Sequence, residues 1–251
     1  MQRRWIFSSD SDPAVVQAVQ RELSIPAFLA RILVNRGFTD PVDADTYLNP
    51  KLRALSAPEL LPDMVLARDR VLAAIQRKER VVLYGDYDVD GTTSLAILAR
   101  IFRAYGVDVG CFLPLRFEEG YGLSEAGLKR CCDLHNPQLL IAVDCGTTSV
   151  SQIAQLKRSG VDVVVLDHHE LASERPDCLA LVNPKCGDDF HYLCSAGVVF
   201  KLVHAMVKSQ PVPGLDLRDF LDLVAMATIA DIVPLVGENR IFVRHGLDRM
   251  E

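Results

Sequence analysis

The stretch RVVLYGDYDVDGTTS, residues 80–94, places three acidic side chains at alternate positions directly after a short apolar run. The apolar residues predict a buried strand, and Asp86, Asp88 and Asp90 follow its end. Carboxylates at the mouth of a parallel sheet are natural ligands for a hard divalent cation. Taken singly, each of these acids also suits an ordinary turn or helix N-cap, with Gly91 relieving backbone strain.

Two later stretches end in the same way. LLIAVDCG, residues 139–146, predicts a buried strand that terminates in Asp144. VVVLDHH, residues 163–169, predicts another that terminates in Asp167, His168 and His169. Because the carboxyl ends of parallel strands meet at one edge of a sheet, we expect these side chains to converge on one crevice. Three such strand ends favour a shared metal site over three unrelated turns.

From residue 79 onward, strands alternate with helices of about ten residues or more, a pattern typical of a parallel sheet with helices on both faces. Strands are expected at 80–86, 107–113, 139–144, 162–167 and 179–183, and helices at 92–105, 124–134, 149–159, 195–208 and 216–229. The preceding residues show helical periodicity at 15–23, 27–36 and 65–77, interrupted by prolines. The sequence therefore predicts an α/β fold, with a helical N-terminal extension over residues 1–78 and a parallel-sheet domain over residues 79–251.

One further acid stands out at the end of the last of these helices. Asp231 lies at its C-terminal edge, just before Ile232, Val233 and Pro234. A negative charge there opposes the helix dipole, so it needs another reason to be present. Either a bound cation or a buried hydrogen bond would supply one.

Charge and composition limit the classes of function. The chain is 49% hydrophobic and carries a formal net charge of −6, which argues against a protein that holds nucleic acid by charge alone. A metal-dependent nuclease is not excluded, because bound cations invert the local field around acidic ligands. The basic pairs Lys129-Arg130 and Lys157-Arg158 are interpreted as solvated helix faces.

Seven cysteines without a CxxC pair predict reduced thiols rather than a disulfide framework or a zinc ribbon. The trio Cys186, His191 and Cys194 lacks a fourth ligand at zinc spacing. The sequence has no long uncharged apolar run and no signal-peptide pattern at its N-terminus, so we expect a cytoplasmic protein that does not contact a membrane.

Six motifs in this order carry a resemblance to a known family: GDYDVDGTTS, RFEEGYGL, AVDCG, LDHH, SAGVVFKL and ATIADIVPL. Together they resemble the DHH phosphoesterases and, within that family, the bacterial exonucleases specific for single-stranded DNA. The resemblance covers essentially the whole chain. The three letters DHH alone are a weak match, but they become specific when they follow the DYDVDG and AVDCG motifs.

The resemblance implies a role for each matching position. The metal ligands would be Asp88, Asp90, Asp144, His168 and Asp231, with Asp144 bridging two ions and Asp86 as a ligand or an outer-sphere acid. His169 would face the scissile phosphate, and Arg116 would lie near the 5′ end of the bound strand. Asp167 is expected to orient an imidazole, so that Asp144, Asp167 and His169 form the catalytic set.

The chemistry implied is hydrolysis of a phosphodiester by two Mn²⁺ or Mg²⁺ ions, since mixed carboxylate and imidazole ligands suit these metals better than zinc. The family resemblance implies a 5′-to-3′ exonuclease of DNA repair and recombination. Its partners would be single-stranded DNA, a single-strand-binding protein and a helicase.

Two alternatives stay open. A DHH phosphoesterase could act on small substrates such as short oligonucleotides, cyclic dinucleotides or pyrophosphate, although such relatives usually carry histidine where this chain has Tyr84. An inactive DHH module could serve in protein interaction, but such modules lose metal acids that are all present in this sequence. We also expect the sequence to stop before the family's second domain and OB-fold, leaving metal binding intact and processive digestion weak or lost.

Overall fold

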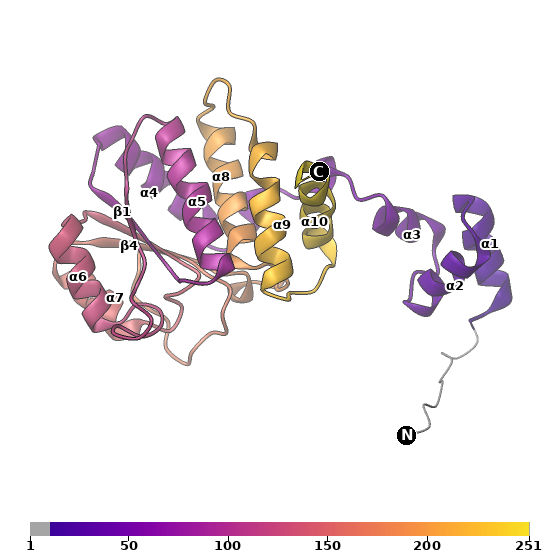
Figure 1. Cartoon of the computed structure of the whole chain (residues 1–251), viewed down its shortest axis with the longest axis horizontal. Coiled ribbons are helices and arrows are strands. Elements are labelled where there is room, and N and C mark those ends of the chain that lie inside the picture. Colours follow the sequence, from indigo (N-terminus) through magenta and orange to yellow (C-terminus); the bar gives the residue numbers. More distant parts are fainter. Residues whose placement is uncertain (1–10, 251) are drawn as a thin grey trace. The chain divides into compact units, whose positions relative to one another are not determined.

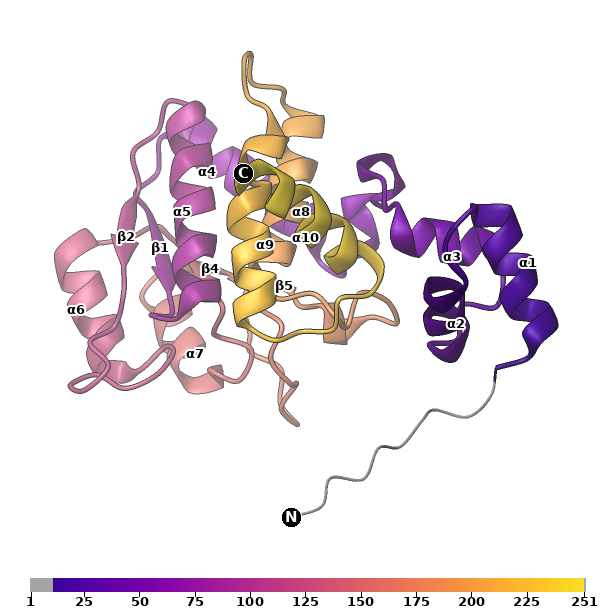
Figure 2. The ribbon, with the colours of Figure 1, turned by 45° about the vertical axis from the view of Figure 1, so that its right-hand side comes forward.

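The computed structural model describes residues 11–250, which divide into two compact units between Ala54 and Leu55. Figures 1 and 2 show both units from two directions. The division falls earlier than the expected boundary after residue 78, because α4 (Met64–Arg77) packs on the sheet-forming unit, against α8 (Ser195–Ser209) and β5 (Ala180–Val182).

The N-terminal unit is helical, as its periodicity predicts. It contains α1 (Pro13–Leu23), α2 (Ala27–Asn35), α3 (Pro41–Leu48) and the short η1 (Leu52–Ala54). The helices share a small apolar core formed by Val16, Val19, Ala30, Leu33 and Ala44. Helix α3 was not expected, because Pro41 reads as a break. In fact Pro41 is the first residue of the helix, where its missing N–H costs nothing, and Asp40 caps the helix by accepting from the Val42 amide at 2.7 Å.

The second unit contains one five-stranded sheet in which every pair of neighbours is parallel. Its order is β2-β1-β3-β4-β5. The strands are β1 (Val81–Gly85), β2 (Gly110–Phe112), β3 (Leu139–Val143), β4 (Asp162–Leu166) and β5 (Ala180–Val182). All five lie inside the predicted ranges, and they confirm the expected parallel sheet.

Side chains alternate between the two faces of this sheet, and helices cover both. On one face, Val82, Leu140 and Val163 pack with Leu128 of α6 (Glu125–His135) and Ile153 of α7 (Val150–Arg158). On the other face, α5 (Val89–Ala104) packs against β1 and β3, and α8 packs against β4. Figure 2 shows α5 and α8 on the opposite side of the strands from α6 and α7.

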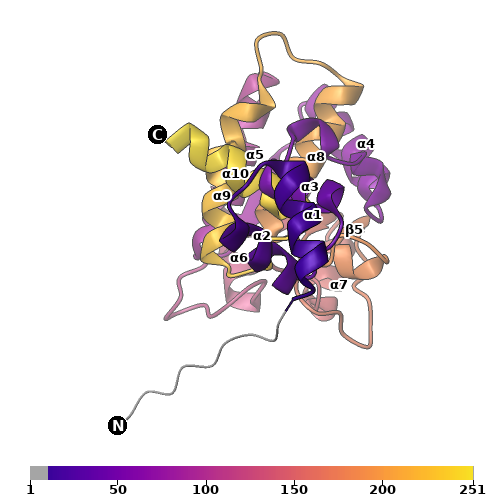
Figure 3. The ribbon, with the colours of Figure 1, turned by 90° about the vertical axis from the view of Figure 1, so that its right-hand side faces the viewer.

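The chain continues beyond α8 through η4 (Leu217–Phe220), α9 (Leu221–Ala230) and α10 (Gly237–Met250). Helix α9 packs against α5 and α10, and the α9 and α10 ribbons lie side by side in Figures 1 and 3. The remaining short helices are η2 (Pro58–Leu60) and η3 (Pro184–Cys186). None of the helices within residues 11–250 is both long enough and apolar enough to cross a membrane.

Candidate metal centre

The strand register brings the predicted site residues together. Gly85, Val143 and Leu166 are aligned across β1, β3 and β4. The residues that follow them, Asp86, Asp144 and Asp167, therefore leave the sheet at the same edge. The strand order changes direction between β1 and β3, and such a switch point is where open α/β sheets bind ligands.

The first acidic motif divides its three carboxylates between a turn and a helix. Asp86 is fully buried, Asp88 is the N-cap of α5, and Asp90 lies in the first turn of that helix. Asp88 accepts from the Gly91 amide at 2.9 Å. The helix thus begins at Val89, earlier than the predicted residue 92, because Asp88 satisfies one of its free amides.

Gly91 has a steric role in this turn. A Cβ atom at this position would lie 2.4 Å from the backbone oxygen of Asp86. The glycine therefore lets α5 approach the end of β1 closely.

Asp144 is a buried acid with an unusual backbone conformation. It is 1% exposed, its φ is +60°, and its Oδ2 atom has no hydrogen-bond partner. Its Oδ1 atom accepts from the Ser195 hydroxyl at 3.1 Å. Burial, reinforced by the neighbouring charges of Asp90 and Asp88, raises the pKa of Asp144 to about 10. A buried carboxylate oxygen without a hydrogen-bond partner, on strained backbone, suits a cation ligand.

His168 joins acids from three separate elements. Its Nε2 atom lies 3.5 Å from Asp144 Oδ1, 3.6 Å from Asp231 Oδ2 and 3.8 Å from Asp90 Oδ2. Neighbouring ligands at about 2.1 Å from an octahedral ion are roughly 3 Å apart, so a small contraction of this group would enclose a cation. Asp231 is the C-cap of α9, as its sequence position predicts.

Asp90 also binds the start of helix α8, a role that the local sequence does not indicate. Its two carboxylate oxygens accept from the backbone amides of Ser195 and Ala196, at 2.7 and 2.8 Å. These amides begin α8, whose N-cap residue Cys194 offers no side-chain hydrogen bond to them. Asp90 thereby fixes α8 to the metal centre, and the Ser195 hydroxyl reaches Asp144 as a consequence. Local sequence patterns gave no sign of this use of Ser195.

Asp167 orients His169 rather than His168. One Asp167 oxygen accepts from His169 Nδ1 at 2.7 Å and from the His168 amide at 2.7 Å, and the other accepts from the Thr147 amide at 3.0 Å. Burial opposes ionisation of Asp167, but the hydrogen bonds from His169 and Thr147 hold its pKa well below the ordinary value. The hydrogen bond to Asp167 also raises the pKa of His169. His169 Nε2 is left 3.3 Å from the hydroxyl of Tyr121.

Three groups of ligand atoms, each within 4.8 Å of one another, emerge from residues 11–250. They are Asp86 with Asp88 and Asp144; Asp90 with His168 and Asp231; and Asp144 with His168 and His169. Because Asp144 and His168 each occur twice, the three groups form one continuous centre. Burial raises the pKa of Asp86, Asp90 and Asp231, and the nearby charges of His168 and His169 partly oppose this shift.

The donor chemistry fits Mn²⁺ or Mg²⁺, since carboxylate oxygens dominate and imidazole is the minor ligand. No cysteine within residues 11–250 belongs to such a group, so the structure does not bring Cys186, His191 and Cys194 together as a site.

A chain of aromatic contacts links Arg116 to this centre. Its guanidinium carbon is 5.0 Å from the centre of the Tyr87 ring, and Tyr87 follows Asp86 in the chain. The Tyr87 and Tyr121 rings meet edge to face, as do the Tyr121 and His169 rings, with centroids 6.1 and 6.3 Å apart. The predicted substrate residue therefore connects to His169 through two tyrosines that sequence reasoning did not single out.

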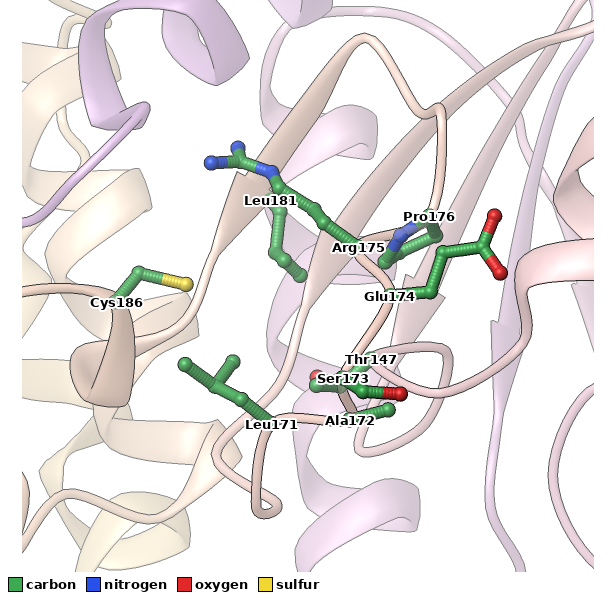
Figure 4. A pocket seen from close by; sticks show the side chains of 9 residues that line it. All are labelled: Thr147, Leu171, Ala172, Ser173, Glu174, Arg175, Pro176, Leu181 and Cys186. Carbon is green, nitrogen blue, oxygen red and sulfur yellow. The ribbon is translucent and has the colours of Figure 1, made fainter.

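The loop after the two histidines covers a separate cavity of about 250 Å³. Figure 4 shows its lining side chains, which include Leu171, Arg175, Leu181 and Cys186. None of the predicted metal ligands lines it. We therefore assign the chemistry to the carboxylate centre and not to this cavity.

A parallel sheet of this strand order, with acids and imidazoles at its switch point, defines an α/β protein built to hold divalent cations. The chain belongs to the DHH family: residues 80–228 match the family's N-terminal domain.

Relatives of known name share most of the chain. It is 37% identical over 98% of its length to the single-stranded-DNA-specific exonuclease RecJ of Bacillus subtilis, and 34% identical over 98% of its length to RecJ of Thermus thermophilus. The chain covers 31% and 35% of these relatives, so it spans about a third of their length. It also resembles the crystal structure of Thermus thermophilus RecJ in complex with Mn²⁺, with a TM-score of 0.78 and 32% identity, covering 96% of this chain and 34% of that one.

Proposed function

We propose that this chain carries the metal-dependent catalytic centre of an exonuclease that hydrolyses single-stranded DNA from its 5′ end, with two Mn²⁺ or Mg²⁺ ions as cofactors. The observation that carries the proposal is that Asp144 and Asp231 both lie within 3.6 Å of the His168 Nε2 atom. These three residues come from two strand ends and one helix end. Similarity to RecJ proteins, including one solved with Mn²⁺, supports both the substrate and the metal.

The metal ligands fall into two sets that share Asp144. One ion would be held by Asp86, Asp88 and Asp144, and the other by Asp144 together with Asp90, His168 and Asp231. When bound, such a pair of ions supplies a nucleophilic hydroxide at neutral pH and neutralises charge on the phosphate. Asp144 suits the shared position because a carboxylate has two oxygens, and one of them lacks any protein partner.

His169 is the residue that would touch the scissile phosphate. Its Nδ1–H donates to Asp167, and this bond fixes the ring and directs Nε2 toward Tyr121, away from Asp167. Because Asp167 favours the protonated imidazole, Nε2–H can donate to a non-bridging oxygen as negative charge develops there. Asp167 contributes by orienting this ring and does not contact the substrate.

The rim beside His169 suits a flexible, unpaired strand. Arg116 supplies a positive charge, and the Phe117 side chain is 98% exposed next to it. Aromatic side chains stack on bases of any sequence, and arginine binds phosphate oxygens. A terminal phosphate held near Arg116 would place the first phosphodiester toward His169 and the metal ligands.

The small-substrate alternative has less support. Tyr84, at the position where such relatives carry histidine, is buried in β1 and donates through its hydroxyl to the Gly122 carbonyl at 2.9 Å. It packs against Phe112 in the core and serves as a structural residue. From the family resemblance we further assign the activity to DNA repair and recombination in the cytoplasm, with a single-strand-binding protein and a helicase as partners.

Hydrolysis of three substrates by the 251-residue chain in Mn²⁺ tests the proposal. A 5′-phosphorylated single strand should be cut from its 5′ end, while the matching duplex and a dinucleotide should be cut much more slowly. Faster hydrolysis of the dinucleotide than of the single strand would favour the small-substrate alternative. Failure to cut any of the three, with Mn²⁺ shown to bind, would contradict the proposed activity for this chain.

A further inference from the structure

The segment between β2 and α6 carries the substrate candidate Arg116, and its shape depends on a side chain from α6. Arg130 was expected on a solvated helix face together with Lys129. The structure keeps Arg130 partly exposed on α6 and adds a contact, because Arg130 turns toward the segment and binds Glu119. The basic residue thus serves a local contact, which its sequence neighbourhood did not indicate.

The Glu119–Arg130 pair has the geometry of a bidentate clamp. Arg130 Nε donates to Glu119 Oε1 at 2.5 Å, and the Arg130 NH2 nitrogen donates to Glu119 Oε2 at 2.7 Å. The Glu119 side chain is 7% exposed. Paired planar groups of this kind fix orientation as well as distance, which a single charge contact does not.

Both partners of the clamp also hold the backbone of the segment. Glu119 Oε2 accepts from the Leu115 amide at 2.7 Å, and Arg130 donates to the Leu113 carbonyl at 3.1 Å. The Glu118 and Glu119 amides both donate to the Leu115 carbonyl, at 3.0 and 2.7 Å. These bonds close a tight turn over residues 115–119.

The turn is anchored to the core at its base and presents side chains at its tip. The Arg130 guanidinium carbon lies 4.2 Å from the centre of the Phe112 ring, at the end of β2. Arg116 and Phe117 occupy the middle of the turn, and both are exposed. The Arg130 hydrogen bond also lowers the pKa of Glu119 to about 2, so the pair stays ionised at neutral pH.

We infer that Glu119 and Arg130 are positioning residues, which hold the 115–119 turn so that Arg116 is aimed at the single strand entering the metal centre. This inference rests on the proposed function for the identity of the strand. Neither residue contacts the strand, and both act through the turn.

A matched pair of variants tests the inference. Arg130→Met removes the clamp and retains most of the side-chain length. Arg70→Met is the control, because Arg70 makes a comparable ion pair with Glu79 at 2.5 Å. Arg70 also binds Asp162, which lies at the opposite end of the strands from the metal centre. Thermal unfolding of both variants would establish whether each remains folded.

The first measurement is hydrogen exchange of the Leu115 and Glu119 amides, which requires no assumption about substrate. Arg130→Met should accelerate exchange at both amides, and Arg70→Met should leave them unchanged. Unchanged exchange in Arg130→Met would overturn the clamp, whatever the protein's function is.

The second measurement is the affinity for a 3′-labelled single strand with a 5′ phosphate, determined by fluorescence anisotropy. Ca²⁺ replaces Mn²⁺ in this assay to prevent cutting. Arg130→Met should weaken binding on the order of tenfold, because a misaligned Arg116 loses most of one charge-assisted hydrogen bond to the phosphate. In an Arg116→Ala background the same change should lower the affinity for the strand by less than about twofold, because the Arg116 side chain that the clamp positions is then absent. Arg70→Met should have the same small effect in both backgrounds.

The outcomes separate the two proposals. If the unmodified chain does not bind the strand, the proposed function fails and the exchange result alone decides the clamp. If the chain binds, equal affinity of Arg130→Met, or an equal loss with and without Arg116, overturns the inference.

Discussion

Replacing Asp144 by asparagine should separate metal binding from folding. The amide matches the carboxyl group in shape, and asparagine tolerates the φ of +60° at this position better than alanine does. Burial and the neighbouring acids raise the pKa of Asp144, which favours its neutral form when no cation is bound. Asparagine then replaces a neutral group by a neutral group.

The expected energies follow from this difference. Without metal, Asp144→Asn should change the free energy of unfolding by less than about 1 kcal/mol, because no charge or packing volume is lost. With Mn²⁺ at a hundred times its dissociation constant, the unmodified chain should gain about 2.7 kcal/mol for each ion. Since Asp144 belongs to two of the three ligand groups, the variant should lose most of that gain at both positions.

Urea unfolding with EDTA and with Mn²⁺ measures both quantities, and titration calorimetry counts the ions bound. Asp162→Asn is the control, since this acid begins β4, at the opposite end of the strands from the metal centre, and is half exposed. Undiminished binding of two ions by Asp144→Asn would refute the shared-ligand role. A loss of several kcal/mol in EDTA would show instead that the carboxyl group is required for folding.

Three further predictions concern residues around the centre. Gly91→Ala should lower the free energy of unfolding by about 1–3 kcal/mol and weaken Mn²⁺ binding, because its Cβ would lie 2.4 Å from the Asp86 carbonyl; an unchanged urea midpoint would contradict this. Lys201→Met should lower the free energy of unfolding in urea by about 3–5 kcal/mol, because it leaves the buried Glu238 carboxylate without its ion pair. A decrease below about 1 kcal/mol would mean that Glu238 finds another partner. Glu119, with a pKa lowered from 4.5 to about 2, should stabilise the fold fully above pH 4.5 and lose that contribution as the pH falls through 2. The stability difference between the unmodified chain and Glu119→Gln should therefore shrink in acid, and a constant difference from pH 7 to pH 2 would oppose this account.

Much of the fold and the centre could be predicted because the decisive signals are local. Each apolar run that ends in an acid, such as LLIAVD at 139–144, identifies both a strand and the side chain at its tip. Parallel pairing then aligns the tips without further information. The same kind of pattern drew attention to His168 and His169 after a strand and to Asp231 at a helix end, but their roles as metal ligands came from the family resemblance.

The remainder depends on contacts between residues far apart in the chain. Asp90 accepts from the amides of Ser195 and Ala196, 105 and 106 positions later, and no local pattern in either segment reveals that bond. Likewise, Arg130 looks like a surface residue until the turn carrying Glu119 folds onto α6. The roles of such residues follow from tertiary packing and not from periodicity.

Anomalous scattering from a crystal of this chain grown with Mn²⁺ tests the central claim most directly. We expect two manganese peaks about 3.5–4 Å apart, both bonded to Asp144, with one also bonded to Asp88 and the other to His168 and Asp231. Manganese bound elsewhere, with no peak within bonding distance of Asp144, would contradict it.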